Sequence, residues 1–229
     1  MGDDAFTGFP PEATAFYAGL RADNTKPYWD ANKAAWERAA RDPMRALVAA
    51  LPERYGPFRI FRPYRDVRFA RDKTPYKTQI GAAGEGEGGS TFYVHLSADG
   101  LYVAAGYYRF AADQLARYRE AVAGAPGDGL PALVEAVESA GFVLGGGAEA
   151  PLKRTPRGWP ADHPRADLLR LKGLTAGREF GEPPWLASAE AAERIVAAWQ
   201  SLAPLTGWLD RHVGPSRELP PEIRALIGA

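Results

Sequence analysis

Basic and tyrosine side chains are concentrated in residues 59–78 of the sequence. This segment holds seven arginines and lysines against two aspartates, a net charge of +5. Arginine matches carboxylate and phosphate groups in a bidentate geometry, lysine adds a point charge, and tyrosine offers a hydroxyl donor. The composition is typical of an anion-binding pocket, and the side chains that we expect to contact a ligand there are Arg62, Arg65, Arg68, Lys73, Tyr76 and Lys77.

A second basic segment spans residues 153–172. It holds six basic residues against two acidic ones, a net charge of +4, and begins with Lys153 and Arg154. Because the formal charge of the whole chain is zero, the remaining residues are acidic. If the two segments meet, they form a basic patch that attracts anions despite the neutral total. We expect them to line one cleft and add Lys153 and Arg154 to the ligand contacts.

Proton transfer at such a site would fall to His163, which stands between Asp162 and Pro164. Histidine titrates near neutral pH and is the commonest general acid or base. If the ligand reacts, we expect His163 to act with Asp162 or Asp66 in hydrolysis or phosphoryl transfer. The alternative is that Asp162 or His163 only caps a short helix that begins near Pro164.

Several other chemistries are excluded. The chain has no cysteine, so it has no disulfide, thiolate nucleophile or cysteine-zinc site. The three histidines are widely separated, and we expect neither a metal nor a cofactor. Gly84, Gly86 and Gly89 spell a dinucleotide-binding motif, but a strand pattern follows it and Glu85 and Glu87 would repel a pyrophosphate.

The elements that must position these residues follow from hydrophobic periodicity. Helical spacing predicts three consecutive helices over 10–23, 29–41 and 43–54, and later helices over 111–123, 130–140, 164–171, 188–202 and 205–213. Alternation predicts strands at 58–60, 67–69, 91–96, 101–107 and 142–144, with Asp99-Gly100 as a hairpin turn. Residues 81–90 are rich in glycine and indicate a flexible loop.

This order of elements favours an α+β fold: one domain with N-terminal helices, a mainly antiparallel sheet containing a β-hairpin, and C-terminal helices. We expect the domain to span residues 1–214, with a peripheral, proline-rich tail at 215–229. The N-terminus has no export signal and no stretch is long and apolar enough to enter a membrane. We therefore expect a cytoplasmic protein that does not bind membranes; the sequence specifies no oligomeric state.

The sequence also resembles a bacterial and fungal family called domain of unknown function 2461. The likeness rests on residues 65–69 (RDVRF), 72–78 (DKTPYKT), Lys153-Arg154, 162–164 (DHP) and 168–172 (LLRLK), and on Trp29, Asn32 and Lys33. It covers about residues 6–213. The resemblance implies no established activity, but it marks the same two basic segments as the charge distribution.

Three functions compete for these features. The first is binding of a small anionic ligand, phosphorylated or carboxylated, in a cleft lined by arginine, lysine and tyrosine. The second is a nucleic-acid-binding module, for which Tyr64, Tyr76 and Trp159 could stack on bases. The third is a structural or interaction protein in which the basic segments form internal ion pairs.

Overall fold

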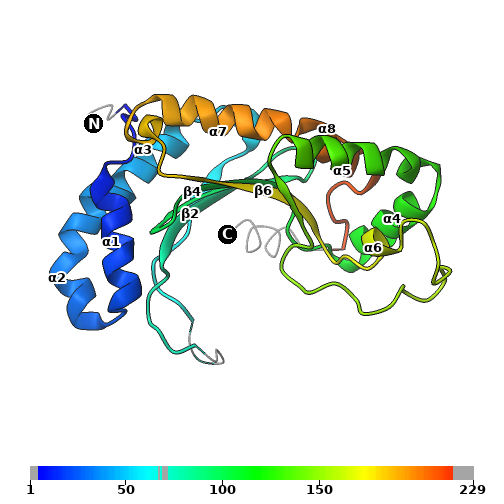
Figure 1. Ribbon diagram of the computed structural model, residues 1–229, viewed down its shortest axis with the longest axis horizontal. Coiled ribbons are helices and arrows are strands. Elements are labelled where there is room, and N and C mark those ends of the chain that lie inside the picture. The colour runs from blue at the N-terminus through cyan, green and yellow to red at the C-terminus, as the bar shows by residue number, and fades with distance from the viewer. Residues whose placement is uncertain (1–4, 67, 69–71, 219–229) are drawn as a thin grey trace.

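A six-stranded antiparallel sheet forms the centre of the computed structural model, which describes residues 5–66, 68 and 72–218 (Figure 1). Its strand order is β1-β2-β3-β4-β6-β5. The strands are β1 (Phe58–Ile60), β2 (Gln79–Glu85), β3 (Thr91–Ser97), β4 (Gly100–Tyr107), β5 (Val143–Gly145) and β6 (Leu174–Gly181). The expected hairpin is confirmed: β3 and β4 pair directly, and Gly100 has the positive φ of 93° that the tight turn requires.

Helices precede, interrupt and follow the sheet, which confirms the predicted α+β class. The first group is α1 (Pro11–Ala22), α2 (Lys26–Trp36), the π-helical η1 (Glu37–Arg41) and α3 (Asp42–Ala50). The middle group is α4 (Ala112–Ala123), α5 (Leu130–Ser139) and the short α6 (Ala166–Leu169). The last group is α7 (Glu190–Ser201) and α8 (Ala203–His212). Short 3-10 turns are η2 (Glu53–Tyr55), η3 (Ala125–Gly129) and η4 (Pro184–Ala187).

One face of the sheet is covered by helices. On β3, Phe92, Val94 and Leu96 are buried, and the ring of Phe92 packs edge-on against Trp199 of α7 with centroids 5.6 Å apart. Figure 1 shows α7 and α8 lying along this side of the sheet. Alternation along a strand therefore places Phe92, Val94 and Leu96 in the core.

The opposite face carries Tyr93 and His95 and is called the open face here. Both side chains are only half-buried. Figure 1 shows α1 and α2 at one end of this side and α4 and α6 at the other, and no helix among the described residues lies across the strands between them. The open face is thus a polar sheet surface flanked by two helical groups.

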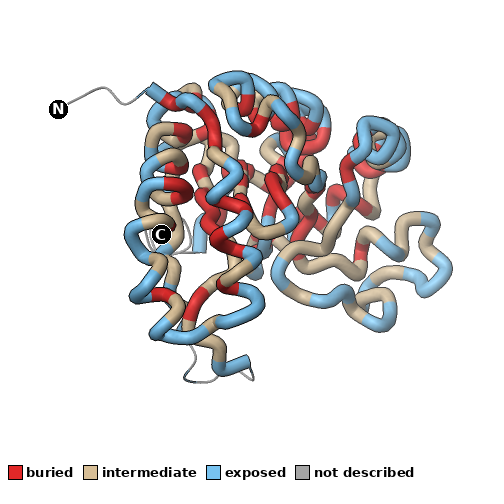
Figure 2. The backbone as a smooth tube through the Cα atoms, turned by 60° about the vertical axis from the view of Figure 1, so that its left-hand side comes forward, coloured by how far each residue is buried: buried red, intermediate tan, exposed pale blue. Residues whose placement is uncertain are grey.

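Burial is concentrated around the sheet, as Figure 2 shows by the red positions in the strands and on the inner sides of the helices. The long connection between β5 and β6 differs, since no residue from Val143 to Leu168 is buried. Among the described residues of the connection between β1 and β2, only Tyr76 is buried. Both basic segments therefore lie largely in solvent-facing connections.

The structure corrects two local predictions. Residues 81–85 are not part of a flexible loop but of β2, which pairs with β1 on one side and β3 on the other. The glycines suit this strand because neighbours approach closely: a Cβ at Gly84 would lie 2.4 Å from the carbonyl oxygen of Tyr55. A strand was expected at 67–69. Asp66 and Arg68 are not in a strand, and Val67 and Phe69 lie outside the described residues.

The start of the predicted tail is attached to the domain. Ser216 is buried and its hydroxyl donates to Asp113 of α4 at 2.7 Å. The backbone N–H of Arg217 donates to the same carboxylate at 2.9 Å. Residues 219–229 lie outside the described part of the chain, and the boundary at residue 214 stays a prediction.

Candidate functional site

The basic loop, residues 61–78 between β1 and β2, is held against the N-terminal helices. The side chain of Asn24 accepts a hydrogen bond from the backbone N–H of Tyr76 at 3.1 Å and donates to the Tyr76 carbonyl at 3.0 Å. Trp29 of α2 stacks on the ring of Tyr76, with centroids 4.5 Å apart. Tyr76 was expected to orient a ligand, but it is buried and anchors the loop instead.

Two of the expected anion contacts are paired within this loop. Arg65 forms an ion pair with Asp72, and Arg68 forms one with Asp66. The hydrogen bonds from the side chain and backbone of Arg68 lower the pKa of Asp66 to about 2. Asp66 therefore stays ionised near neutral pH and is held by Arg68, and its role as the partner of His163 stays a prediction. These pairs match the internal ion-pair network considered above.

Three other cations lie near one another, and we call Arg59, Arg62 and Lys77 the cation cluster. The charge of Arg62 also helps to lower the pKa of Asp66, so that carboxylate lies near the cluster. Among the described residues, none of the three forms an ion pair. Lys77 Nζ lies over the ring of Phe61, 5.3 Å from its centroid. Burial, followed by the charges of Arg62, Arg59 and Arg65, lowers the pKa of Lys77. The cluster is thus a site where positive charges repel one another.

The cation cluster borders the open face. Arg59 of β1 is opposite Ala83, which is opposite Tyr93, so Arg59 and Tyr93 share one face of the sheet. The backbone N–H of Phe61 donates to the carbonyl of Gly81 at 2.8 Å and continues the same pairing. The cations of β1 and of the basic loop therefore lie beside the polar strand residues.

A hydrogen-bonded chain lies on this face. Gln79 Nε2 donates to Tyr93 Oη at 3.0 Å, and Tyr93 Oη lies 3.1 Å from His95 Nδ1. Burial raises the pKa of Tyr93 to about 12 and lowers the pKa of His95 to about 4. At neutral pH both groups are uncharged. Because Gln79 donates to Tyr93, the Tyr93 hydroxyl can donate to Nδ1, which favours the His95 tautomer protonated on Nε2.

The second basic segment makes its contacts in its own helical group. Arg165 donates to carbonyl oxygens at the end of α4 and pairs with Asp128 at 2.8 Å. Lys172 pairs with Glu149 at 2.8 Å. Lys153 and Arg154 are exposed on the connection between β5 and β6. Among the described residues no hydrogen bond or ion pair joins the two segments, and their convergence on one ligand stays a prediction.

His163 serves the turn that leads into α6. Its Nδ1 accepts a hydrogen bond from the backbone N–H of Arg165 at 3.0 Å, and its carbonyl accepts from Ala166 at 2.8 Å. These contacts stabilise the turn before the helix, but the N-cap position of α6 is Arg165 and no side chain caps it, so the capping alternative also stays a prediction. In the described part of the chain no hydrogen bond links Asp162 or Asp66 to the His163 ring, so a catalytic role for the three residues stays a prediction without geometric support.

Residues 12–208 match the family described as Conserved hypothetical protein (DUF2461). The chain belongs to this family. The DUF2461 match extends from α1 to α8 and includes the basic loop and the open face. No curated protein and no solved structure matches the chain. Since the family description names no activity, any function has to be argued from the site.

Two negative findings hold for the described residues of this DUF2461 member. No group of three or more histidine, aspartate or glutamate side chains is arranged to hold a metal ion. No helix there combines the length and apolar character needed to cross a membrane.

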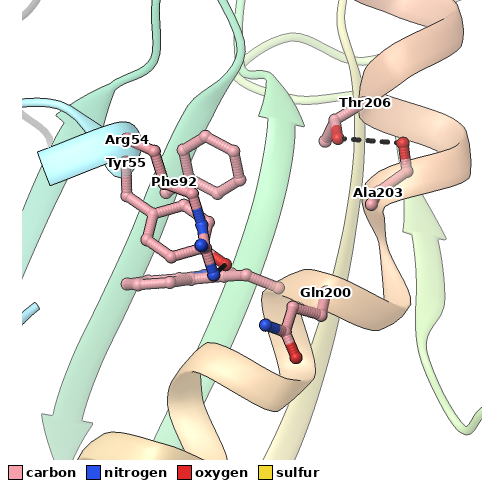
Figure 3. A pocket seen from close by; sticks show the side chains of 7 residues that line it. Arg54, Tyr55, Phe92, Gln200, Ala203 and Thr206 are labelled. Atoms are coloured by element: carbon pink, nitrogen blue, oxygen red, sulfur yellow. Dashed lines mark hydrogen bonds between the residues drawn. The ribbon is translucent and has the colours of Figure 1, made fainter. Parts of the chain in front are cut away.

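A pocket of about 340 Å³ lies elsewhere, on the helix-covered side of the sheet (Figure 3). Its lining residues are Arg54, Tyr55, Phe92, Trp199, Gln200, Ala203 and Thr206. The rings of Tyr55, Phe92 and Trp199 pack on one another, with centroids 4.7–5.6 Å apart. Trp199 Nε1 donates to the carbonyl of Ala104 at 3.0 Å. This hollow is the rim of the hydrophobic core and is separated from the cation cluster by the sheet.

Tyr102 of β4 is opposite His95 in the strand register and lies on the same face. Sequence reasoning missed five members of the candidate site, which are Arg59, Gln79, Tyr93, His95 and Tyr102. The available signal was the alternation in residues 91–96 and 101–107, which assigns Tyr93, His95 and Tyr102 to the less apolar face. That pattern does not reveal whether another layer covers the face. That this face of the sheet is not covered by a helix of the described residues follows only from where the helices pack.

Proposed function

We propose that the protein binds a small anion at the cation cluster, on the rim of the open face. The observation that carries the proposal is that Arg59, Arg62 and Lys77 lie near one another and none of them forms an ion pair with a described carboxylate, while Arg65 and Arg68 beside them are paired. Arginine and lysine together suit a phosphate monoester or a carboxylate. A bound anion would offset the mutual repulsion and raise the pKa of Lys77.

Arg62 and Lys77 were among the ligand contacts expected from the sequence, and the proposal retains both. Arg59 is a new member of the site. Lys73, Lys153 and Arg154 are exposed and remain candidates for a second layer of contacts. Lys153→Gln tests the single-cleft prediction directly. If the second segment reaches the same ligand, this substitution weakens binding, whereas an independent segment leaves the affinity unchanged.

Lys77→Gln is expected to weaken anion binding by about ten- to hundredfold, because a hydrogen bond to a charged group contributes about 1.5–3 kcal/mol. The unliganded variant should melt at the same temperature as the wild type or slightly higher, since a repelled charge is removed. Calorimetric titration with inorganic phosphate and with ribose 5-phosphate measures the first effect, and a thermal melt measures the second.

Arg211→Gln is the matched control for this experiment. Arg211 is exposed on α8, on the covered side of the sheet, so its removal changes the net charge equally without touching the cation cluster. The proposal fails if neither anion binds the wild type, or if Lys77→Gln and Arg211→Gln behave alike.

Nucleic-acid binding remains the second candidate, and salt dependence separates it from small-anion binding. A protein that contacts several phosphates of a strand releases several counterions, so its affinity falls steeply with salt. A single bound phosphate predicts a shallow slope. Titrations at several salt concentrations with inorganic phosphate and with a short single-stranded RNA measure both slopes.

A further inference from the structure

A row of aromatic rings crosses the open face and begins at the cation cluster. The rings belong to Phe61, Tyr93, His95 and Tyr102, and successive centroids lie 6.3, 5.4 and 4.9 Å apart. His95 and Tyr102 are stacked, with an interplanar angle of 25°. We call this set the aromatic row. Phe61 extends β1, Tyr93 and His95 stand on β3 and Tyr102 stands on β4, with β2 lying between β1 and β3, so strand pairing sets the spacing of the rings.

Two glycines let the tyrosines lie across the sheet. A Cβ at Gly177 of β6 would lie 2.0 Å from the hydroxyl of Tyr102, which stands on β4. A Cβ at Gly81 of β2 would lie 2.9 Å from the hydroxyl of Tyr93 on β3. Each tyrosine therefore extends over the backbone of an adjacent strand. His95 and Tyr102 lie nearly parallel to one another, whereas the ring of Tyr93 is inclined by 61° to His95 and by 62° to Tyr102, whose centroid is 6.2 Å away.

The row also has electrical polarity. At one end Lys77 Nζ lies over Phe61, with Arg59 and Arg62 nearby. At the other end Glu179 of β6 is opposite Tyr102 in the strand register and is exposed. An anionic group is therefore favoured beside Phe61, and a hydrogen-bond donor is favoured beside Tyr102.

We infer that the ligand anchored at the cation cluster also carries a planar heteroaromatic ring that stacks on the aromatic row, as a mononucleotide does. This inference rests on the proposed anion site. The phosphate of such a ligand contacts Lys77, Arg59 and Arg62, and its base packs against the nearly parallel rings of His95 and Tyr102, beside the inclined ring of Tyr93. Glu179, at the end of the row beside Tyr102, then accepts a hydrogen bond from an exocyclic amino group of the base.

The ring contributes affinity that the phosphate alone lacks. Base-aromatic stacking is worth about 5- to 150-fold in affinity per base, converted from measured alanine substitutions. Phosphate and sugar phosphates cannot stack on the aromatic row, because they present no planar face. Mononucleotides should therefore bind more tightly than ribose 5-phosphate, and ribose 5-phosphate should bind about as tightly as inorganic phosphate.

The experiment titrates the full-length protein with inorganic phosphate, ribose 5-phosphate, AMP, GMP, CMP and UMP. It compares the wild type with Tyr102→Leu, which removes the ring, and Tyr102→Phe, which keeps it. We expect at least one nucleotide to bind at least fivefold more tightly than ribose 5-phosphate. Tyr102→Leu should erase most of that advantage, Tyr102→Phe should retain it within about twofold, and neither should change ribose 5-phosphate affinity. Tyr93→Leu, in the middle of the row, provides a second ring deletion if Tyr102→Leu does not fold.

The outcomes separate this inference from the proposed function. If all six probes bind equally, the ring site is wrong and the anion site stands. If none binds, the proposed function itself fails. A nucleotide preference that survives both ring deletions overturns the assignment to the aromatic row. A short single-stranded RNA that binds far more tightly than every mononucleotide, with a steep salt slope, replaces the mononucleotide by a nucleic-acid strand and overturns the inference.

Discussion

Trp29→Ala is expected to reduce the free energy of unfolding by about 3–5 kcal/mol, the usual cost of truncating a buried tryptophan. Trp29 is 2 % exposed and its ring lies among those of Phe16, Trp36, Tyr64 and Tyr76. Alanine would leave a cavity between α2 and the basic loop. Urea denaturation of the variant and the wild type measures the loss.

The same substitution should also weaken anion binding under conditions where the variant is folded. Lys77 follows Tyr76 directly, so loss of the Trp29 stack loosens the segment that holds the ammonium group. Asn24→Ala is the matched comparison, because it removes two hydrogen bonds to Tyr76 and leaves the ring stack intact. We expect it to cost about 1–3 kcal/mol. A loss below 1 kcal/mol for Trp29→Ala would contradict the anchoring role.

His95→Gln is expected to remove a pH dependence of stability between about pH 6.5 and pH 4. Burial lowers the pKa of His95 from 6.5 to about 4, so the unfolded chain binds a proton there before the folded protein does. The free energy of unfolding therefore falls as the pH falls through this window, by about 3 kcal/mol in total. Above pH 6.5 the ring is neutral in both states and this loss is absent.

The measurement is a series of urea denaturations from pH 4 to pH 7.5 on the wild type and the glutamine variant. Other groups that titrate in the window affect both proteins, so only the difference between the two curves reports His95. That difference should change by about 3 kcal/mol between pH 7 and pH 4. Parallel curves would mean that His95 titrates normally in the folded protein.

The hairpin illustrates what local patterns predict well. Alternation in 91–96 and 101–107 and the Asp99-Gly100 turn were enough to predict β3 and β4, because hairpin pairing depends on neighbours in the sequence. Strand β2 illustrates the opposite case. Its glycine-rich sequence has little strand propensity, yet it forms a strand because β1 and β3 pair with it on both sides. Glycine is required at 81 and 84 because Tyr93 and Tyr55 approach these positions too closely for a side chain.

For the basic loop, too, some features could be predicted from composition and others depend on the folded structure. Charge counting identified the segment, and Arg62 and Lys77 were among the expected contacts. The pairing of Arg65 with Asp72 and of Arg68 with Asp66 depends on how the loop folds back on itself. Composition cannot separate cations that are paired from cations that are not.

By itself, the sequence determined the α+β class, the family and the concentration of positive charge in two segments, because these follow from periodicity, motif and composition. The tertiary structure decided that Tyr76 is an anchor, that Arg59 joins Arg62 and Lys77, and that Tyr93, His95 and Tyr102 lie on a face that no helix of the described residues covers. The physical reason is that ion pairing, burial and exposure of a sheet face are set by segments far apart in the chain. A local pattern shows which face a residue shares, but not what lies against that face.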